Sequence, residues 1–309
     1  MKYQLFRLSF TTGVHFGTTS LEESGFLFAA DTLFSALCIE ALKQGDRYFE
    51  LFYSSVKEGK LLFSDGLPYI NDSFYIPRPH LYIERQASGD SGQKKAVRKL
   101  THLPVDSLKD YLAGNMDFEK EGNIFRNIGK YSSRTSAAVR GREDSLPYRI
   151  GIFNFMENAG IYILVVAADD KLLKETEELL IALSFTGIGG RRSQGLGKYD
   201  LFLEKKLPES LHAGLEAGCR HYMTLSISMP QKEELENVIP EAGYKLVKRS
   251  GFVFSDSYAE SFQRKKDFYL FSSGSCFTTR FNGDVYDVSG FGSHPVYRYA
   301  KPIFIGVDQ

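Results

Sequence analysis

The order of the periodic segments in the first half of the chain constrains the fold more than any other feature. Stripped of its polar insertions, this half reads strand, helix, strand, strand, helix, strand, which is the order of a ferredoxin-like βαββαβ unit. The expected elements are an alternating strand at 2–11, a helix from about Asp31 to Gly45, short strands at 60–63 and 73–76, a short helix at 105–112, a hairpin of 148–155 with 161–167, a helix from Asp169 or Asp170 to about Phe185, and a strand at 198–203.

The second half reads as a weaker copy of the first. Residues 205–218 resemble a linker, 221–229 alternate like a strand, and Pro230 is placed to open a helix rich in glutamate. Strand-like runs follow at 246–254, 268–271, 276–281 and 301–307. We therefore predict an α+β fold of two tandem ferredoxin-like (RRM-like) domains, 1–204 and 205–309, with a glycine-rich loop and a polar insertion in the first.

Composition excludes several classes of protein. Cys38, Cys219 and Cys276 are far apart and form no CxxC pair, which argues against a thiolate zinc site and a disulfide framework and favours a reducing cytoplasm. The first residues read as a strand and not as a signal peptide, and no apolar run is long enough to span a bilayer. The 38 basic and 38 acidic residues balance, so contacts to nucleic acid require local clusters of charge. No metal or cofactor is expected.

The strongest candidate site is the segment 184–199, SFTGIGGRRSQGLGKY, which contains three cations and no acid. Glycines let the backbone approach a ligand closely, turns of this kind expose amides to anions, and arginines add phosphate contacts. The segment lies between a helix and a strand, the reverse of a P-loop or dinucleotide fingerprint. The alternative is a flexible connection with solvated arginines. The candidate RNA-binding residues here are Gly187, Gly189, Gly190, Arg191, Arg192, Ser193 and Gln194.

Three further segments carry candidates for RNA binding. In 11–17, TTGVHFG, His15 beside Phe16 suits base stacking, hydrogen bonding or general-base chemistry, although a lone histidine is more often structural. In 288–301, cations interleave with aromatics, which suits single-stranded nucleic acid or an ordinary edge strand. The basic excursion around Arg134 to Arg142 and the pair of runs 248–251 and 264–266 are weaker. The candidates are Thr12, Gly13, His15, Phe16, Arg134, Arg140, Arg249, His294, Tyr297, Arg298 and Lys301.

The segments TTGVHFG at 11–17, AADTLFSAL at 29–37, GIGGRRSQGLGKYDLF at 187–202 and SGFGSHPVYRYAKPIFIGV at 289–307 together resemble the RAMP superfamily of CRISPR proteins. Within it, the sequence is most similar to the family of the fourth Csm subunit of type III-A effectors. The resemblance covers essentially the whole chain. It implies two ferredoxin-like domains and a protruding thumb hairpin that disturbs the guide–target duplex, best matched here by 130–147.

The resemblance also implies a role and partners. The expected function is a non-catalytic RNA-binding subunit that caps the 5′ handle of the guide RNA and bridges the large polymerase-palm-like subunit to the backbone subunits. No residue matches the acidic group with which the family's backbone subunits cut target RNA. The alternative is a metal-independent endoribonuclease that processes repeat RNA with His15 as general base. A small-molecule enzyme using the glycine-rich loop is disfavoured by the helix-to-strand order.

Overall fold

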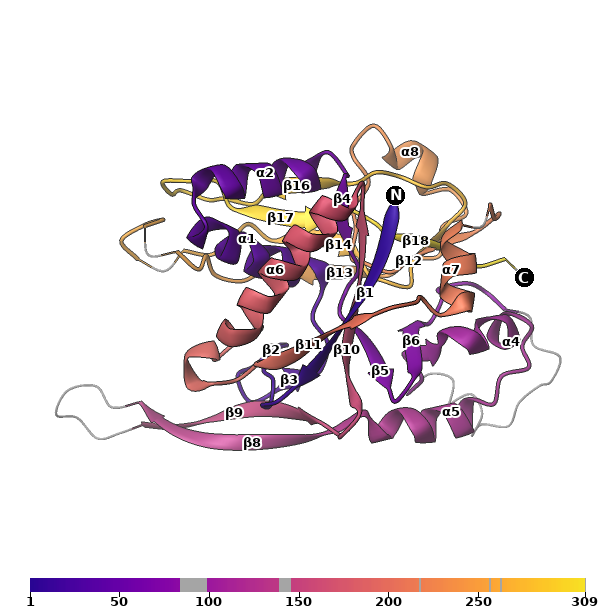
Figure 1. Ribbon diagram of the computed structural model, residues 1–309, viewed down its shortest axis with the longest axis horizontal. Helices are drawn as coiled ribbons and strands as arrows, with labels where there is room; N and C mark the ends of the chain where they lie inside the picture. Colours follow the sequence, from indigo (N-terminus) through magenta and orange to yellow (C-terminus); the bar gives the residue numbers. More distant parts are fainter. Residues whose placement is uncertain (84–98, 139–145, 217, 256, 262, 309) are drawn as a thin grey trace.

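One antiparallel sheet organises the first half of the chain. The computed structural model (Figure 1) describes residues 1–83, 99–138, 146–216, 218–255, 257–261 and 263–308. The strands of this sheet are β1 (Lys2–Phe10), β4 (Leu61–Phe63), β5 (Leu67–Ile70), β6 (Ser73–Pro77), β7 (His102–Pro104), β10 (Ala159–Ala167) and β11 (Tyr199–Glu204). They follow the order β11-β1-β10-β5-β6-β7, with β4 also paired to β10. β11, β1, β10 and β5 lie side by side, each antiparallel to its neighbour, which is the arrangement that a βαββαβ unit requires, although β5 was not among the expected strands.

Three helices, α1 (Ala30–Lys43), α2 (Asp46–Lys57) and α6 (Asp170–Thr186), gather at the upper left of Figure 1. As predicted, Asp169 caps α6, its carboxylate accepting a hydrogen bond from the Leu172 amide at 2.9 Å. Helix α1, expected to begin near Asp31, has Ala29 as its N-cap residue, and Asp31 lies in its first turn. The carboxylate of Asp65 supplies the cap from outside the helix, accepting from the Ala30 amide at 2.8 Å.

Helix α2 was not predicted, because Gly45 reads as the end of a helical pattern. Gly45 has a φ of 113°, a value that favours glycine, and the chain turns there from α1 directly into α2. The short helix expected at 105–112 is confirmed as a 3₁₀ turn followed by α4. The remaining small elements are β2 (Phe16–Gly17), β3 (Ser24–Gly25), η1 (Val105–Ser107), α4 (Leu108–Leu112), α5 (Phe118–Phe125), η2 (Arg126–Ile128) and η3 (Arg192–Gln194).

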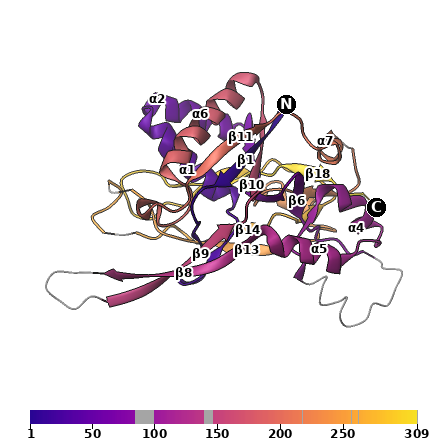
Figure 2. The ribbon, with the colours of Figure 1, turned by 60° about the horizontal axis from the view of Figure 1, so that its bottom comes forward.

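A long two-stranded ribbon, β8 (Gly129–Ala138) with β9 (Leu146–Phe155), projects from the body of the molecule (Figure 2). The prediction that β9 forms a hairpin with β10 is wrong. Both edges of β10 are already paired, one to β1 and the other to β4 and β5, so β9 pairs with β8 instead. The ribbon contains the described part of the predicted thumb segment.

The second half forms several small sheets. Its elements are α7 (Glu209–Glu216), β12 (Tyr222–Thr224), α8 (Leu235–Val238), β13 (Leu246–Arg249), β14 (Phe268–Phe271), β15 (Cys276–Phe277), β16 (Asp284–Asp287), β17 (Tyr297–Ala300) and β18 (Phe304–Gly306). β15, β12 and β18 form one sheet, and β13–β14 and β16–β17 form two ribbons. The predicted linker 205–218 contains α7, which buries Leu211 and Leu215, so this segment is packed. The described residues of this half form no second four-stranded sheet.

The two halves share one core. Ile227, Leu270 and Val285 of the second half belong to the same buried cluster as the helices of the first. The Tyr299 hydroxyl accepts from the Phe63 amide at 2.9 Å, and one oxygen of Asp65 accepts from both the Ala30 and the Ile227 amides. These contacts cross the predicted domain boundary. The two halves are therefore joined both by apolar packing and by hydrogen bonds.

Asp65 makes the stability of this junction depend on pH. Burial raises the pKa of Asp65 to about 6, since desolvation outweighs the hydrogen bonds from the Ile227 and Ala30 amides. A carboxyl whose pKa is raised by folding binds its proton more tightly in the folded state, so its charge lowers stability as the pH rises from about 4 to about 6.

We expect Asp65→Asn to keep both amide hydrogen bonds without the buried charge. At pH 8 the free energy of unfolding of the variant should exceed that of the wild type by about 1–3 kcal/mol, and the difference should vanish near pH 4. Chemical denaturation at the two pH values measures both quantities. Asp65→Ala, which lacks the acceptor, should be destabilised at both. An Asn variant that behaved like the Ala variant would show that the ionised form is required.

Candidate nucleic-acid interface

The glycine-rich loop between α6 and β11 is tightly folded. Its backbone closes on itself, with the Ile188 amide donating to the Gly197 carbonyl at 3.0 Å. Gly197 has a φ of 79°, and a Cβ atom there would lie 2.1 Å from the Ile188 oxygen, so no side chain fits. Arg191 also takes a left-handed conformation, with a φ of 58°. The loop therefore has a defined backbone conformation held by its own hydrogen bonds. This differs from the flexible connection that was the alternative interpretation.

The 11–17 segment packs beneath this loop and is hydrogen-bonded to it. The Gly190 amide donates to the His15 carbonyl at 2.8 Å, and the Gly197 amide to the Gly13 carbonyl at 3.0 Å. The Lys198 amide donates to the Thr12 hydroxyl. The structure thus brings together the two sequence segments that carried the strongest signals, although they lie far apart in the chain.

His15 and Phe16, both predicted to contact RNA, lie beneath the glycine-rich loop. Both side chains are buried, and the His15 Nδ1 lies 2.7 Å from the Gly151 carbonyl, to which it can donate. The His15 ring packs under Gly190, where an added Cβ would lie 2.8 Å from its Cδ2. We assign both side chains the role of supporting the loop, because burial leaves little of either for a ligand.

A groove of about 860 Å³ opens beside the loop, between α1 and the second half of the chain. We call it the cationic groove, because the charges that line it are strongly one-sided. One acid, Asp31, is matched against the cations Lys43, Arg191, Arg192, Lys198, Arg249, Lys265 and Arg298. In a chain with no net charge, these residues give the groove a local excess of positive charge.

Asp31 fixes one wall of the cationic groove. It accepts from Arg249 at 2.6 Å and from Arg298 at 2.5 Å. Burial by itself would raise the pKa of Asp31, but the charges and hydrogen bonds of Arg249 and Arg298 outweigh it and hold the pKa below its ordinary value. Arg298, one of the predicted RNA-binding residues, is only 4% exposed and pairs with Asp31.

The predicted RNA-binding residues of 288–301 do not form one patch. They line three different hollows of the surface, in part because successive residues of a strand point to opposite sides. Arg298 faces the cationic groove, whereas His294 and Tyr297 line a neighbouring hollow of about 730 Å³. Tyr297 stacks on Tyr53 with ring centres 4.3 Å apart, and His294 Nε2 lies 2.9 Å from the Ser255 hydroxyl. Lys301 is buried and lines a different pocket, so its predicted place among the RNA contacts is not supported.

Aromatic side chains accompany the loop arginines. Arg192 lies over the exposed ring of Phe254, with 5.2 Å between its guanidinium carbon and the ring centre, and Arg191 lies over Tyr148 at 5.4 Å. Such pairs present flat surfaces on which bases stack. Phe254, Lys43 and Lys265 were not among the predicted site residues; Lys265 belongs to a basic run noted in the sequence, but a lone phenylalanine or lysine carries no signal.

The projecting ribbon is tied to the loop through Arg134, whose guanidinium donates to the Gln194 side chain at 2.9 Å. Among the predicted site residues, Ser193 lines the cationic groove. Gln194 and Arg134 are exposed beside it. Arg140 lies outside the described residues. Searched over those same residues, the chain shows no cluster of acids, histidines or cysteines suited to a metal ion, and no helix long and apolar enough to cross a membrane.

Comparison with known proteins decides the family. A protein of Mycobacterium tuberculosis named CRISPR system Cms protein Csm4 is 38% identical over 310 residues, covering 100% of this chain and 99% of that relative. The chain belongs to the Csm4 family. A Csm4 protein of Streptococcus thermophilus is 31% identical over 317 residues, covering both chains completely. The family model described as the CRISPR Csm4 C-terminal domain matches residues 218–307.

The Csm4 fold is also found among solved structures. A chain of the Csm3–Csm4 subcomplex in the type III-A CRISPR-Cas interference complex superposes with a TM-score of 0.67 at 19% identity, covering 99% of this chain and 100% of that one. A chain of a Csm1–Csm4 cassette in complex with pppApA gives a TM-score of 0.62 at 17% identity, covering 99% and 98%. At these identities the match establishes the fold alone.

Proposed function

We propose that this chain is a non-catalytic RNA-binding subunit of a type III-A CRISPR effector that holds the 5′ handle of the guide RNA in the cationic groove. The observation that carries the proposal is the convergence of the glycine-rich loop, α1 and the second half on one groove. Asp31 pairs with Arg249 and Arg298, and Lys43 pairs with Glu40. The groove cations that have no ion pair among the described residues are Arg191, Arg192, Lys198 and Lys265. Each cation that neutralises a phosphate releases a counterion, which is the main source of affinity for a nucleic acid strand.

The arrangement also favours binding over cleavage. His15 is buried beneath the loop, with its Nδ1 against the Gly151 carbonyl, so its ring is positioned to support the backbone. A general base must reach the proton it abstracts, within hydrogen-bond distance or through one water. The second half then acts as a reduced ferredoxin-like domain whose Arg249 and Lys265 complete the groove.

We further propose that the subunit bridges the large subunit and a backbone subunit, because Csm4 relatives occur in structures with Csm1 and with Csm3. Apolar side chains remain exposed on α6 and β11, outside the cationic groove for the most part: Ile181, Phe185, Phe202 and Leu203. Glu234, the N-cap residue of α8, is used within the chain, where it accepts from the Asn282 and Gly283 amides.

The test is to purify the tagged chain from cells that carry its effector genes and a CRISPR array, and to sequence the RNA that accompanies it. We expect guide RNAs that share a repeat-derived 5′ end, together with the large and backbone subunits. RNase treatment before the pulldown shows which partners are held by protein contacts alone. Recovery of unrelated RNA, or of the chain without any effector subunit, would contradict the proposal.

A parallel assay addresses catalysis. Purified chain incubated with labelled repeat RNA in EDTA should leave the RNA intact. Cleavage under these conditions that disappears in His15→Ala would instead establish a metal-independent endoribonuclease.

A further inference from the structure

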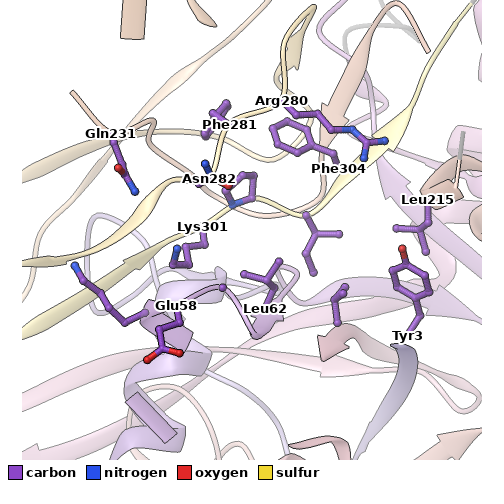
Figure 3. Close-up of a pocket in the computed structure, with 15 residues that line it drawn as sticks. Tyr3, Glu58, Leu62, Leu215, Gln231, Arg280, Phe281, Asn282, Lys301 and Phe304 are labelled. Carbon is purple, nitrogen blue, oxygen red and sulfur yellow. The ribbon is translucent and has the colours of Figure 1, made fainter. Parts of the chain in front are cut away.

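A second pocket lies at the junction of the two halves and shares no lining residue with the cationic groove. It has a volume of about 500 Å³, within the range of small-molecule sites. We call it the junction pocket. Tyr3 and Leu62 of the first half form one side, and the 280–283 loop with the segment leading into β18 forms the other (Figure 3).

Lys301 places a buried positive charge on the wall of the junction pocket. Its side chain is only 4% exposed, and within the described residues its ammonium makes one hydrogen bond, a long one of 3.4 Å to the Gly283 carbonyl. A lysine ammonium has three donors, and typical hydrogen bonds from nitrogen are about 2.7–3.2 Å long. Donors therefore remain for a ligand in the pocket.

The acids nearest to Lys301 are engaged elsewhere. Asp284 pairs with Lys57 at 2.7 Å, and Glu234 accepts from the amides of the 281–283 loop. Desolvation by burial lowers the pKa of Lys301. A shift in this direction is expected when nearby acids compensate the charge of a buried cation only in part. Leaving such a charge buried is costly, and a bound anion would offset the cost.

Much of the remaining lining of the junction pocket is apolar and aromatic. Leu62, Val166 and Ile303 line it, and the Phe281 and Phe304 rings meet edge to face with centres 5.2 Å apart. Figure 3 places Tyr3 and Leu215 at the end of the pocket away from Lys301 and Gln231. Arg280 also lines the pocket, on the side of Tyr3 and Leu215, and the lining acid Glu58 is paired with Lys60. Cations together with apolar and aromatic surface suit a small molecule that has an anionic group and an apolar or aromatic body.

We propose that the junction pocket binds a small phosphate-bearing molecule, with Lys301 holding the phosphate and the apolar wall packing against the remainder. Lys57, which also lines the pocket, is already paired with Asp284, so Lys301 carries the charge that the phosphate would meet at this end. The site is independent of the RNA function, because the cationic groove uses none of these residues.

The experiment is calorimetric titration of the full chain with AMP, inorganic phosphate and adenosine. We expect AMP to bind more tightly than either fragment, since only AMP engages both ends of the pocket. Lys301→Met, which keeps the length of the side chain but removes its charge, should weaken AMP binding at least tenfold. Lys232→Met, at an exposed lysine next to Gln231 outside the lining, is the matched control and should bind AMP like the wild type.

Two further measurements keep the proposal testable. Lys301→Arg should retain AMP binding if the charge is what matters. In the wild-type chain, AMP should shift the amide NMR resonances of Gly59, Asn282 and Phe304, a readout that needs no variant. Absence of these shifts at millimolar AMP would overturn the proposal, as would AMP binding that survives Lys301→Met but is lost in an Arg191→Ala/Arg192→Ala variant.

Discussion

Replacing Asp31 with alanine is expected to lower the free energy of unfolding by about 3–5 kcal/mol, the usual cost of breaking a buried ion pair by removing one partner. The substitution leaves the guanidinium of Arg298 without its carboxylate in a site where only 5% of that side chain is exposed. Arg249 suffers less, because 31% of its side chain is exposed and water can solvate it. Chemical denaturation at neutral pH measures the loss.

Two comparisons separate the buried charge from other effects of the Asp31 substitution. The double variant Asp31→Leu/Arg298→Met removes both buried charges and should be more stable than Asp31→Ala, since no unpaired ion remains. Asp267→Asn breaks an exposed pair with Lys248 and should change stability by no more than about 1 kcal/mol. If Asp31→Ala proved no worse than Asp267→Asn, the triad would not hold the groove wall.

The same triad predicts a dependence on acid. The pKa of Asp31 lies below its ordinary value in the folded chain, so its contribution is present at neutral pH and is lost as the pH falls through that lowered pKa. The stability difference between the wild type and Asp31→Ala should therefore be constant from about pH 5 to 8 and shrink below about pH 4.

The second large effect is expected at the glycine-rich loop. Arg191→Ala combined with Arg192→Ala should weaken guide RNA binding about 10–100-fold at moderate salt. It should also reduce the slope of log affinity against log salt by about 1.4, because two phosphate contacts on a single strand are lost. Both side chains line the cationic groove, and neither is needed for the loop's backbone hydrogen bonds. Filter binding or fluorescence anisotropy over a salt series gives both numbers.

The matched control for the loop arginines removes two lysines from an exposed helical surface. Lys171→Ala with Lys174→Ala, in the first turns of α6, makes the same change in net charge outside the groove. This control should change the affinity less than twofold. Equal effects of the two double variants would mean that net charge governs binding and that the groove is not the RNA site.

Several features of the molecule were predictable from local pattern. The strand at 2–11, the Asp169 cap and the succession of strands and helices in the first half follow from periodicity and capping, which act over a few residues. The unusual backbone conformation of the glycine-rich loop was also predictable from its glycines. Gly187, Gly189 and Gly197 all take positive φ values, which glycine adopts at little cost.

Pairing and burial were not predictable in this way. The partner of β9 depends on β10 having both edges occupied, a fact set by strands from distant parts of the chain. The roles of Arg298 and Lys301 likewise depend on burial: as sequence they read as exposed cations, yet one completes a triad with Asp31 and the other faces the junction pocket.

The chain's own pattern of glycine, charge and apolar spacing specified strands β1, β10 and β11, helices α1 and α6, and the segments 11–17 and 184–199. Tertiary structure alone brought Lys43, Arg249 and Lys265 to the loop, buried His15 beneath it, and separated Lys301 from the cationic groove. The physical reason is one of range. Periodicity and turn chemistry act between near neighbours, whereas a groove or a buried charge is made by residues that meet only when distant elements pack.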